Sequence, residues 1–238
     1  MKASFAGFPT EGFTFLRSLK RNNNREWFQA RKQIFDEKVK APMVELVEAV
    51  NREMAAFAPD YVNEPQKAIY RIYRDTRFSH DKTPYKTHIA AIFPRRGMDK
   101  HVGGGLYFSV SPFEVEVAGG AYMPGPDELK TMRAYLAEHY EELRRIVRAP
   151  ALRKQVGELQ GNQLARVPKG YPKEHPAADL LRYTQLYVFA TIEPALATTP
   201  KLLGEIVKRL RAMTPLVDFL NAPLVAAARK ASRGSFLP

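Results

Sequence analysis

The chain has 238 residues, 45% of them hydrophobic, which is enough to bury a sizeable core in one large domain. Its 37 lysines and arginines outnumber 25 aspartates and glutamates, so a formal charge of +12 attracts polyanions at low salt. The absence of cysteine excludes disulfides, thiol nucleophiles, iron–sulfur clusters and thiolate zinc sites. No apolar leader and no run of about 18 apolar residues occurs, so we expect a soluble, cytoplasmic protein without membrane contact.

The first quarter of the chain has the 3.6-residue periodicity of amphipathic helices. Thr10 is expected to cap the first helix, and one of the asparagines at 22–24 is expected to cap the second. Pro42 is expected to interrupt the second helix before a third continues to Phe57. The single tryptophan, Trp27, is interpreted as a core anchor or, alternatively, as a stacking platform for a base or ring.

From residue 68 to residue 122 the chain changes to short alternating segments separated by Gly and Pro, which is typical of an antiparallel meander. The expected strands cover residues 68–74, 87–94, 104–111 and 113–121, with 185–192 as a further strand. The glycine run at 103–105 leads into a strand and not a helix. We therefore interpret it as a close backbone approach and not as a nucleotide loop.

The remaining segments favour helices around an irregular, proline-rich loop. Gly125 and Pro126 begin a helix that Pro150 is expected to close, and a short helix is expected at 177–181. Thr199 is expected to cap a closing helix. We predict a single α+β domain over residues 1–221, with a mostly antiparallel sheet of about five strands and helices packed before and after it. Residues 222–238 are expected to form a C-terminal helix end or a basic tail.

Residues 68–88, AIYRIYRDTRFSHDKTPYKTH, concentrate charged and hydroxyl side chains between a strand-like segment and a proline turn. Such closely spaced cations suit a phosphate or a carboxylate. The residues expected to bind the ligand are Arg71, Arg74, Arg77, Ser79, Lys82, Tyr85 and Lys86. Asp75 and Asp81 are the candidates for handling a proton, and Lys169 and Tyr171 of the proline-rich loop are the candidates for a second wall. The alternative is a structural network in which the aspartates only orient the arginines.

Four motifs together resemble a known family. They are NNNREWF, RIYRDTRFSHDKTPYKTH, the glycine pair in VAGGAYMP, and RVPKGYPKEHPAADLLR. In this order they resemble the conserved hypothetical family filed as domain of unknown function 2461, over about Phe8 to Leu220. The resemblance implies a shared fold and no particular reaction.

Two functions from different classes are left open. The first is a protein, enzyme or sensor, that holds a small phosphorylated or carboxylated ligand in a basic cleft at residues 71–86. The second is a nucleic-acid-associated module, with weak and non-specific binding, that stacks bases on Tyr70, Tyr73, Phe78 and Tyr85. No metal-binding spacing, Walker loop, nucleophile elbow or dinucleotide fingerprint occurs, so no metal site is predicted and the cofactor is left unassigned. The sequence makes no prediction of oligomeric state.

Overall fold

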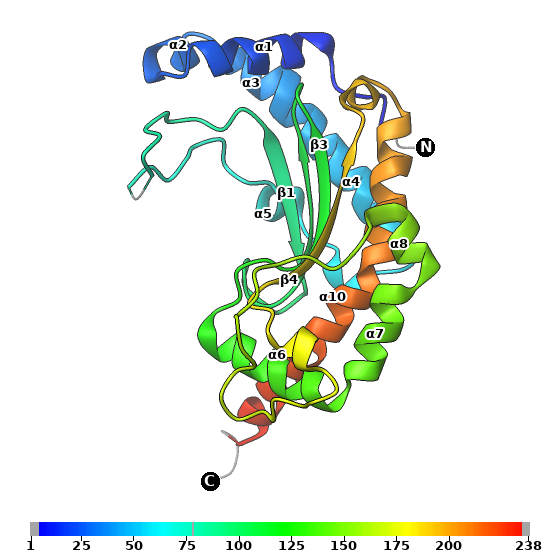
Figure 1. Ribbon diagram of the computed structural model, residues 1–238. Helices are drawn as coiled ribbons and strands as arrows, with labels where there is room; N and C mark the ends of the chain where they lie inside the picture. Colours follow the sequence, from blue (N-terminus) through cyan, green and yellow to red (C-terminus); the bar gives the residue numbers. More distant parts are fainter. Residues whose placement is uncertain (1–4, 78, 235–238) are drawn as a thin grey trace. The chain divides into compact units, whose positions relative to one another are not determined.

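Within residues 5–77 and 79–234, which the computed structural model describes, the chain forms helices around one four-stranded sheet (Figure 1). The sheet is antiparallel, and its strands follow one another in chain order, β1-β2-β3-β4. The strands are β1 (Ile89–Pro94), β2 (Gly105–Val110), β3 (Val115–Ala121) and β4 (Leu186–Ile192). The predicted α+β class is confirmed, with four strands where about five were expected.

The strand expected at residues 68–74 is the one that the structure does not form. Ala68 ends the short helix α5 (Pro65–Ala68), and the following residues make only isolated antiparallel bridges, Ile69 with Ala91 and Tyr73 with Tyr85. The stretch from Ile69 to Tyr73 therefore faces a longer stretch from Tyr85 to Ala91. Unequal lengths interrupt the ladder, so alternating side chains alone did not produce a continuous strand.

The chain folds into two compact units, each assembled from three separated stretches. Unit 1 contains residues up to 93, 107–117 and 191–208. Unit 2 contains residues 94–106, 118–190 and 209 onward. Each unit contains segments of the strands, and the single domain predicted for residues 1–221 stays a prediction.

The N-terminal helices of unit 1 follow the predicted spacing with two corrections. They are α1 (Thr10–Arg21), α2 (Arg25–Gln29), α3 (Lys32–Phe35), a π-helical turn (Asp36–Lys40) and α4 (Ala41–Met54). Asn24 caps α2 as expected, because its side chain accepts a hydrogen bond from the Trp27 amide at 2.9 Å. The N-cap position of α1 is occupied by Pro9 and not by Thr10, which is the first residue of the helix. Pro42 does not break the chain of helices, because it lies in the first turn of α4, where its missing N–H is not needed.

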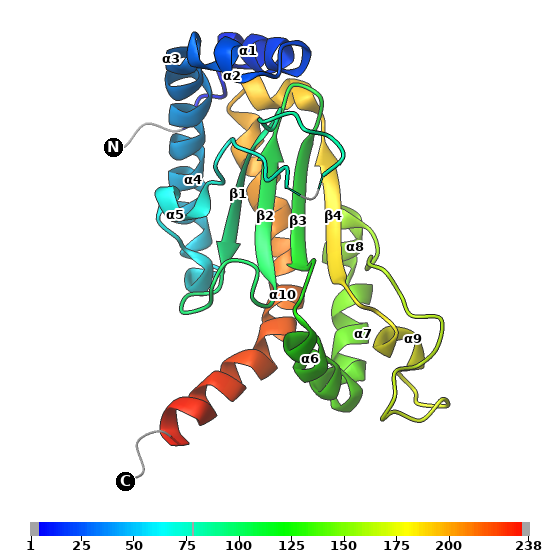
Figure 2. The same cartoon turned by 90° about the vertical axis from the view of Figure 1, so that its left-hand side faces the viewer.

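The sheet segment in unit 1 has one apolar face and one polar face. Side chains alternate along a strand, so Phe108 and Val110 of β2 share the buried face with Val115 and Val117 of β3. Helix α4 lies on this side, and residues 69–88 leave from the other side (Figures 1 and 2). The opposite alternation places polar side chains of β2 and β3 on the side from which residues 69–88 leave.

Unit 2 is mainly helical. Its helices are α6 (Pro126–Glu138), α7 (Tyr140–Arg148), α8 (Pro150–Val156), α9 (Ala178–Leu181) and most of α10 (Lys201–Gly234). The single helix expected between Pro126 and Pro150 is interrupted at His139, and Pro150 opens α8 instead of closing the preceding helix. Proline favours a first helical turn, so its presence after a helix also permits a new start. Helix α10 continues past Asn221 to Gly234.

The glycine run before β2 is held against α10 by a buried asparagine. Asn221 donates through Nδ2 to the Gly104 carbonyl at 2.8 Å and accepts from the Gly104 amide through Oδ1 at 2.8 Å. Gly103 has φ +72°, and a Cβ there would overlap Asn221 Oδ1. The run is therefore a close backbone approach, as the sequence predicts.

Candidate functional site

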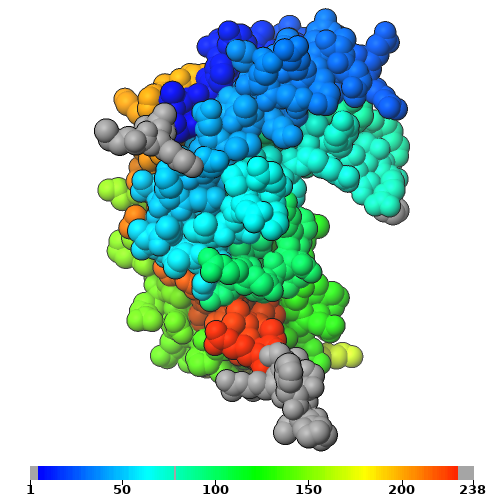
Figure 3. Space-filling model, turned by 180° about the vertical axis from the view of Figure 1, so that it is seen from behind, coloured from blue at the N-terminus to red at the C-terminus, as the bar shows by residue number. Residues whose placement is uncertain are grey.

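Residues 69–88 form an arm that projects from unit 1 beside the N-terminal helices (Figure 3). Its two sides are joined at the base by backbone hydrogen bonds, from the Arg74 amide to the Pro84 carbonyl at 2.9 Å and from the Lys86 amide to the Ile72 carbonyl at 2.8 Å. Phe78, one of the expected stacking residues, lies outside the described residues. The rest of the arm is thus an irregular hairpin and not a free loop.

Two contacts with the N-terminal helices fix the base of the arm. Asn23 donates to the Tyr85 carbonyl at 2.9 Å and accepts from the Tyr85 amide at 3.1 Å. The Tyr85 ring stacks on Phe28 with centroids 4.1 Å apart, and the Tyr73 ring lies 6.4 Å from Phe28. Tyr85 is only 2% exposed, so the structure places this predicted ligand-binding residue in the core of unit 1.

Trp27 lies next to this anchor and is half-buried. Its ring lies 5.4 Å from that of Phe15, and the Arg31 guanidinium lies 4.6 Å above it. Arg31 therefore covers a ring surface that a base would need for stacking. These contacts favour the core-anchor interpretation of Trp27.

Arg74 closes the arm across its width. Its guanidinium forms an ion pair with Asp81, donates a hydrogen bond to Thr83 and reaches the Ser79 hydroxyl at 3.5 Å. Asp81 also accepts from the Thr83 amide at 2.9 Å. Arg74 is half-buried, and its donors serve the arm itself. This is the arrangement expected of a structural latch.

Arg77 forms a second, separate pair with Asp75. Its Nε donates to Oδ1 at 3.0 Å and its Nη2 to Oδ2 at 2.8 Å, a bidentate geometry. The side-chain hydrogen bonds from Arg77 lower the pKa of Asp75 to about 2. The Thr83 amide, followed by Arg74, lowers the pKa of Asp81 to about 2. Such weak bases are poorly matched to proton transfer near neutral pH, so the geometry favours an orienting role for both aspartates.

The remaining cations of the arm make contacts of other kinds. Lys82 donates to the Thr76 carbonyl at 2.9 Å, and the Lys86 ammonium lies 4.9 Å above the Tyr70 ring. Arg71 is exposed, and no hydrogen bond joins it to any described residue; its electrostatic partner is Asp75, which already binds Arg77. Among the described residues, the three arginines thus divide between two aspartates, and Lys82 and Lys86 contact Thr76 and Tyr70 instead.

Lys169 and Tyr171 belong to unit 2, as does His175, which Tyr171 contacts. The Tyr171 ring meets His175 edge-on at 6.5 Å. Arg144 holds the same loop by donating to Asp179 and to the Pro176 carbonyl. The second wall formed by Lys169 and Tyr171 stays a prediction.

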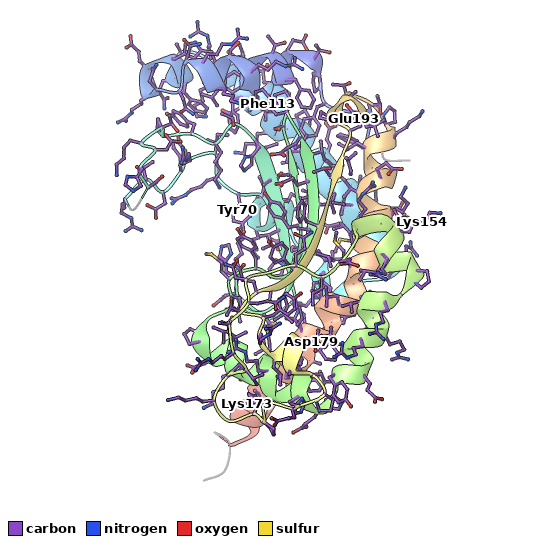
Figure 4. All side chains as sticks on the ribbon, viewed as in Figure 1. Tyr70, Phe113, Lys154, Lys173, Asp179 and Glu193 are labelled. Atoms are coloured by element: carbon purple, nitrogen blue, oxygen red, sulfur yellow. The ribbon has the colours of Figure 1, made fainter. Side chains whose placement is uncertain are left out.

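The polar face of β2 and β3 is a feature that the sequence analysis missed. We call it the arm-side face and define it by Tyr107, Ser109 and Glu116. Ser109 donates to Glu116 at 3.3 Å, and Tyr107 lies two residues before Ser109 on the same face of β2. The Tyr70 ring, at the base of the arm, lies 6.5 Å from the Tyr107 ring, and Figure 4 shows Tyr70 beside β1.

Ionisable groups at and beside the arm-side face are shifted toward their neutral forms. Burial raises the pKa of Tyr70 to about 12 and also raises the pKa of Tyr107. Burial, followed by repulsion from the neighbouring carboxylate of Glu114, raises the pKa of Glu116. Burial, followed by the charge of Lys86, lowers the pKa of His88. Clusters of shifted groups are common at functional sites.

The period-two alternation of β2 and β3 was the available signal for the arm-side face. It places Tyr107, Ser109 and Glu116 opposite the apolar residues. Alternation alone does not show that Tyr70 lies against Tyr107, because that contact joins the arm to the second strand of the sheet.

Two further observations concern metal binding and membrane-spanning helices. No three of their histidine, aspartate or glutamate side chains are grouped closely enough to hold a metal ion. Along the described parts of the chain, no helix is both long and apolar enough to cross a membrane.

Comparison with known proteins agrees with the resemblance carried by the four motifs. Residues 11–219 match a family described as "Conserved hypothetical protein (DUF2461)". No match was found among curated proteins or among solved structures. Because the matched region covers most of the chain, the protein belongs to the DUF2461 family of conserved hypothetical proteins.

Proposed function

We propose that this protein binds a small phosphorylated or carboxylated molecule on its basic arm. The carrying observation is the excess of positive over negative side chains within the arm. Residues 71–86 include five lysines or arginines and two aspartates, and both aspartates already accept hydrogen bonds from Arg77 or Arg74. The surplus favours an anion, because closely spaced cations repel one another unless a negative charge lies between them.

The construction of the arm supports the same proposal. Asn23 and Phe28 hold its base, and the Arg74 latch holds its width, so little conformational freedom is lost when a ligand binds. Arg71 presents a planar guanidinium suited to two oxygens of one phosphate or carboxylate, whereas Lys86 presents a point charge.

Thermal unfolding with and without inorganic phosphate, sulfate and nucleotides tests the proposal, because a ligand bound only by the folded state raises the midpoint. We expect wild type to be stabilised, and Arg71→Ala or Lys86→Ala to lose that stabilisation. Arg17→Ala is the matched control, since Arg17 is exposed on α1, away from the arm sequence. Equal stabilisation of all four proteins, or no stabilisation of wild type, would contradict the proposal.

Nucleic-acid binding is the second candidate because of Tyr73. This side chain is 44% exposed on the arm, two residues from Arg71. Exposed aromatic rings beside cations are the usual stacking sites for single strands. In contrast to binding at a small-anion site, the affinity for a single strand would rise with the length of the strand and would depend on the Tyr73 ring.

A further inference from the structure

We infer that the arm-side face completes the anion site, and that the ligand is a phosphorylated polyhydroxy compound such as a sugar phosphate. In this arrangement the phosphate binds Lys86, and ligand hydroxyl groups bind Tyr107 and Glu116. The inference rests on the proposed function and names the ligand class.

The distribution of charge gives the ligand its orientation. At the arm end, the Lys86 ammonium lies 4.9 Å from the Tyr70 ring centroid, and Tyr70 in turn lies 6.5 Å from Tyr107. At the other end, Glu114 and Glu116 are close enough to repel one another. An anion is attracted to Lys86 and repelled by the two glutamates, so the opposite end of the ligand must be uncharged or carry hydrogen-bond donors.

The polar groups on the arm-side face can bind further hydrogen-bonding partners. Ser109 is buried, and its hydroxyl donates to Glu116. A carboxylate has about four acceptor sites, and Ser109 fills one of those on Glu116. Ligand hydroxyls both donate and accept, so they can extend this chain, whereas an apolar group would bury these atoms without partners.

The phenols contribute donors at neutral pH. Tyrosine is already protonated at neutral pH, and burial raises the pKa values of Tyr70 and Tyr107 further, so both phenols stay neutral beside a ligand. A protonated phenol donates to a phosphate or sugar oxygen and adds no negative charge beside the phosphate. Together with Lys86 and Tyr70 of the arm, the arm-side face thus offers one cation, neutral phenols and the acidic acceptor Glu116.

Calorimetric titration with ribose 5-phosphate, ribose and inorganic phosphate tests the inference. We expect wild type to bind ribose 5-phosphate at least tenfold more tightly than either fragment. The affinities of Tyr107→Phe and of Glu116→Gln for ribose 5-phosphate should each fall about tenfold, while the affinity for inorganic phosphate is kept. Tyr107→Phe removes a half-buried hydroxyl, and Glu116→Gln replaces a half-buried charged acceptor with a neutral amide. Lys86→Ala should lose affinity for both ribose 5-phosphate and inorganic phosphate. Tyr122→Phe and Glu193→Gln are matched controls at exposed positions and should bind as wild type does.

The outcomes separate this inference from the proposed function. Equal affinity of wild type for ribose 5-phosphate and phosphate, or unchanged binding by Tyr107→Phe and Glu116→Gln, would overturn the inference. The proposed function would still stand if phosphate stabilised the wild type and not Arg71→Ala. If no phosphate compound bound at all, both would fail. Unfolding midpoints of the variants near that of wild type would show that lost binding does not result from lost folding.

Discussion

Asn23 and Tyr85 are joined by a pair of hydrogen bonds that imitates a β-bridge. The side-chain amide of Asn23 donates to the Tyr85 carbonyl at 2.9 Å, and its oxygen accepts from the Tyr85 amide at 3.1 Å. Its neighbour Asn24 caps α2, and Phe28 of that helix stacks on the Tyr85 ring. The asparagine run therefore anchors the arm, which links two of the family motifs, NNNREWF and RIYRDTRFSHDKTPYKTH, through direct contacts.

The first prediction follows from this anchor. Asn23→Ala removes a donor and an acceptor and leaves part-buried backbone groups of Tyr85 without partners, so the free energy of unfolding should fall by about 1–3 kcal/mol. Urea unfolding measures the change, and hydrogen exchange of the Tyr85 amide should be faster in the variant. Asn22→Ala is the control, because Asn22 is exposed and its side chain donates to the Ser18 carbonyl in the last turn of α1. A loss of stability in Asn22→Ala as large as that in Asn23→Ala would contradict the assigned role.

The fold could be predicted from the sequence wherever one element carries its own signal. The period-two pattern located all four observed strands to within two residues at their ends, because each has a buried face. Residues 68–74 show the same alternation, but the unequal stretches between the Ile69 and Tyr73 bridges prevent a continuous ladder. Strand pairing depends on a partner far away in the sequence, and alternation does not reveal its length.

The candidate site was predicted only in part, for a related reason. The surplus of cations at residues 71–86 can be read directly from the sequence. Which arginine pairs with which aspartate, Arg77 with Asp75 and Arg74 with Asp81, depends on how the arm folds back. Alternation places Tyr107 and Glu116 on the polar face of their strands, but it does not distinguish them from ordinary exposed polar residues. Their shifted pKa values arise from burial, which the linear sequence does not show.

The second prediction concerns pH. The pKa of Asp81 is lowered to about 2 from an ordinary 3.8, so folding favours the charged carboxylate. Its contribution to stability is present above the ordinary pKa and is lost as the pH falls through the range from about 4 to 2. Asp81→Asn should therefore be less stable than wild type at neutral pH, and urea unfolding should show this difference shrinking as the pH falls through that range. A difference that stayed constant with pH would show that the charge of Asp81 does not hold the arm. Asp99→Asn is the control for removal of an exposed carboxylate.

The third prediction concerns the contact between α10 and the glycine run. Asn221 is fully buried and satisfies both backbone groups of Gly104. Asn221→Ala leaves these groups without that partner, and the free energy of unfolding should fall by about 2–4 kcal/mol. Chemical denaturation measures the loss, with Gln163→Ala as an exposed control in the same unit. A loss within about 0.5 kcal/mol, the range of ordinary surface substitutions, would show that the glycine run does not depend on this side chain.

The fourth prediction separates non-specific attraction from a dedicated nucleic-acid site. With a formal charge of +12, the protein should bind a fluorescent single-stranded oligonucleotide weakly at low salt and with little sequence preference. If the arm neutralises about three to five phosphates, affinity should fall roughly 20- to 100-fold between about 50 and 200 mM salt, because bound counterions are released on binding. Fluorescence anisotropy measures this slope. Tyr73→Ala should change the affinity less than Arg71→Ala does, since charge and not stacking supplies the attraction. Tight binding that persisted at physiological salt and was lost in Tyr73→Ala would contradict this expectation and favour a nucleic-acid function for the arm.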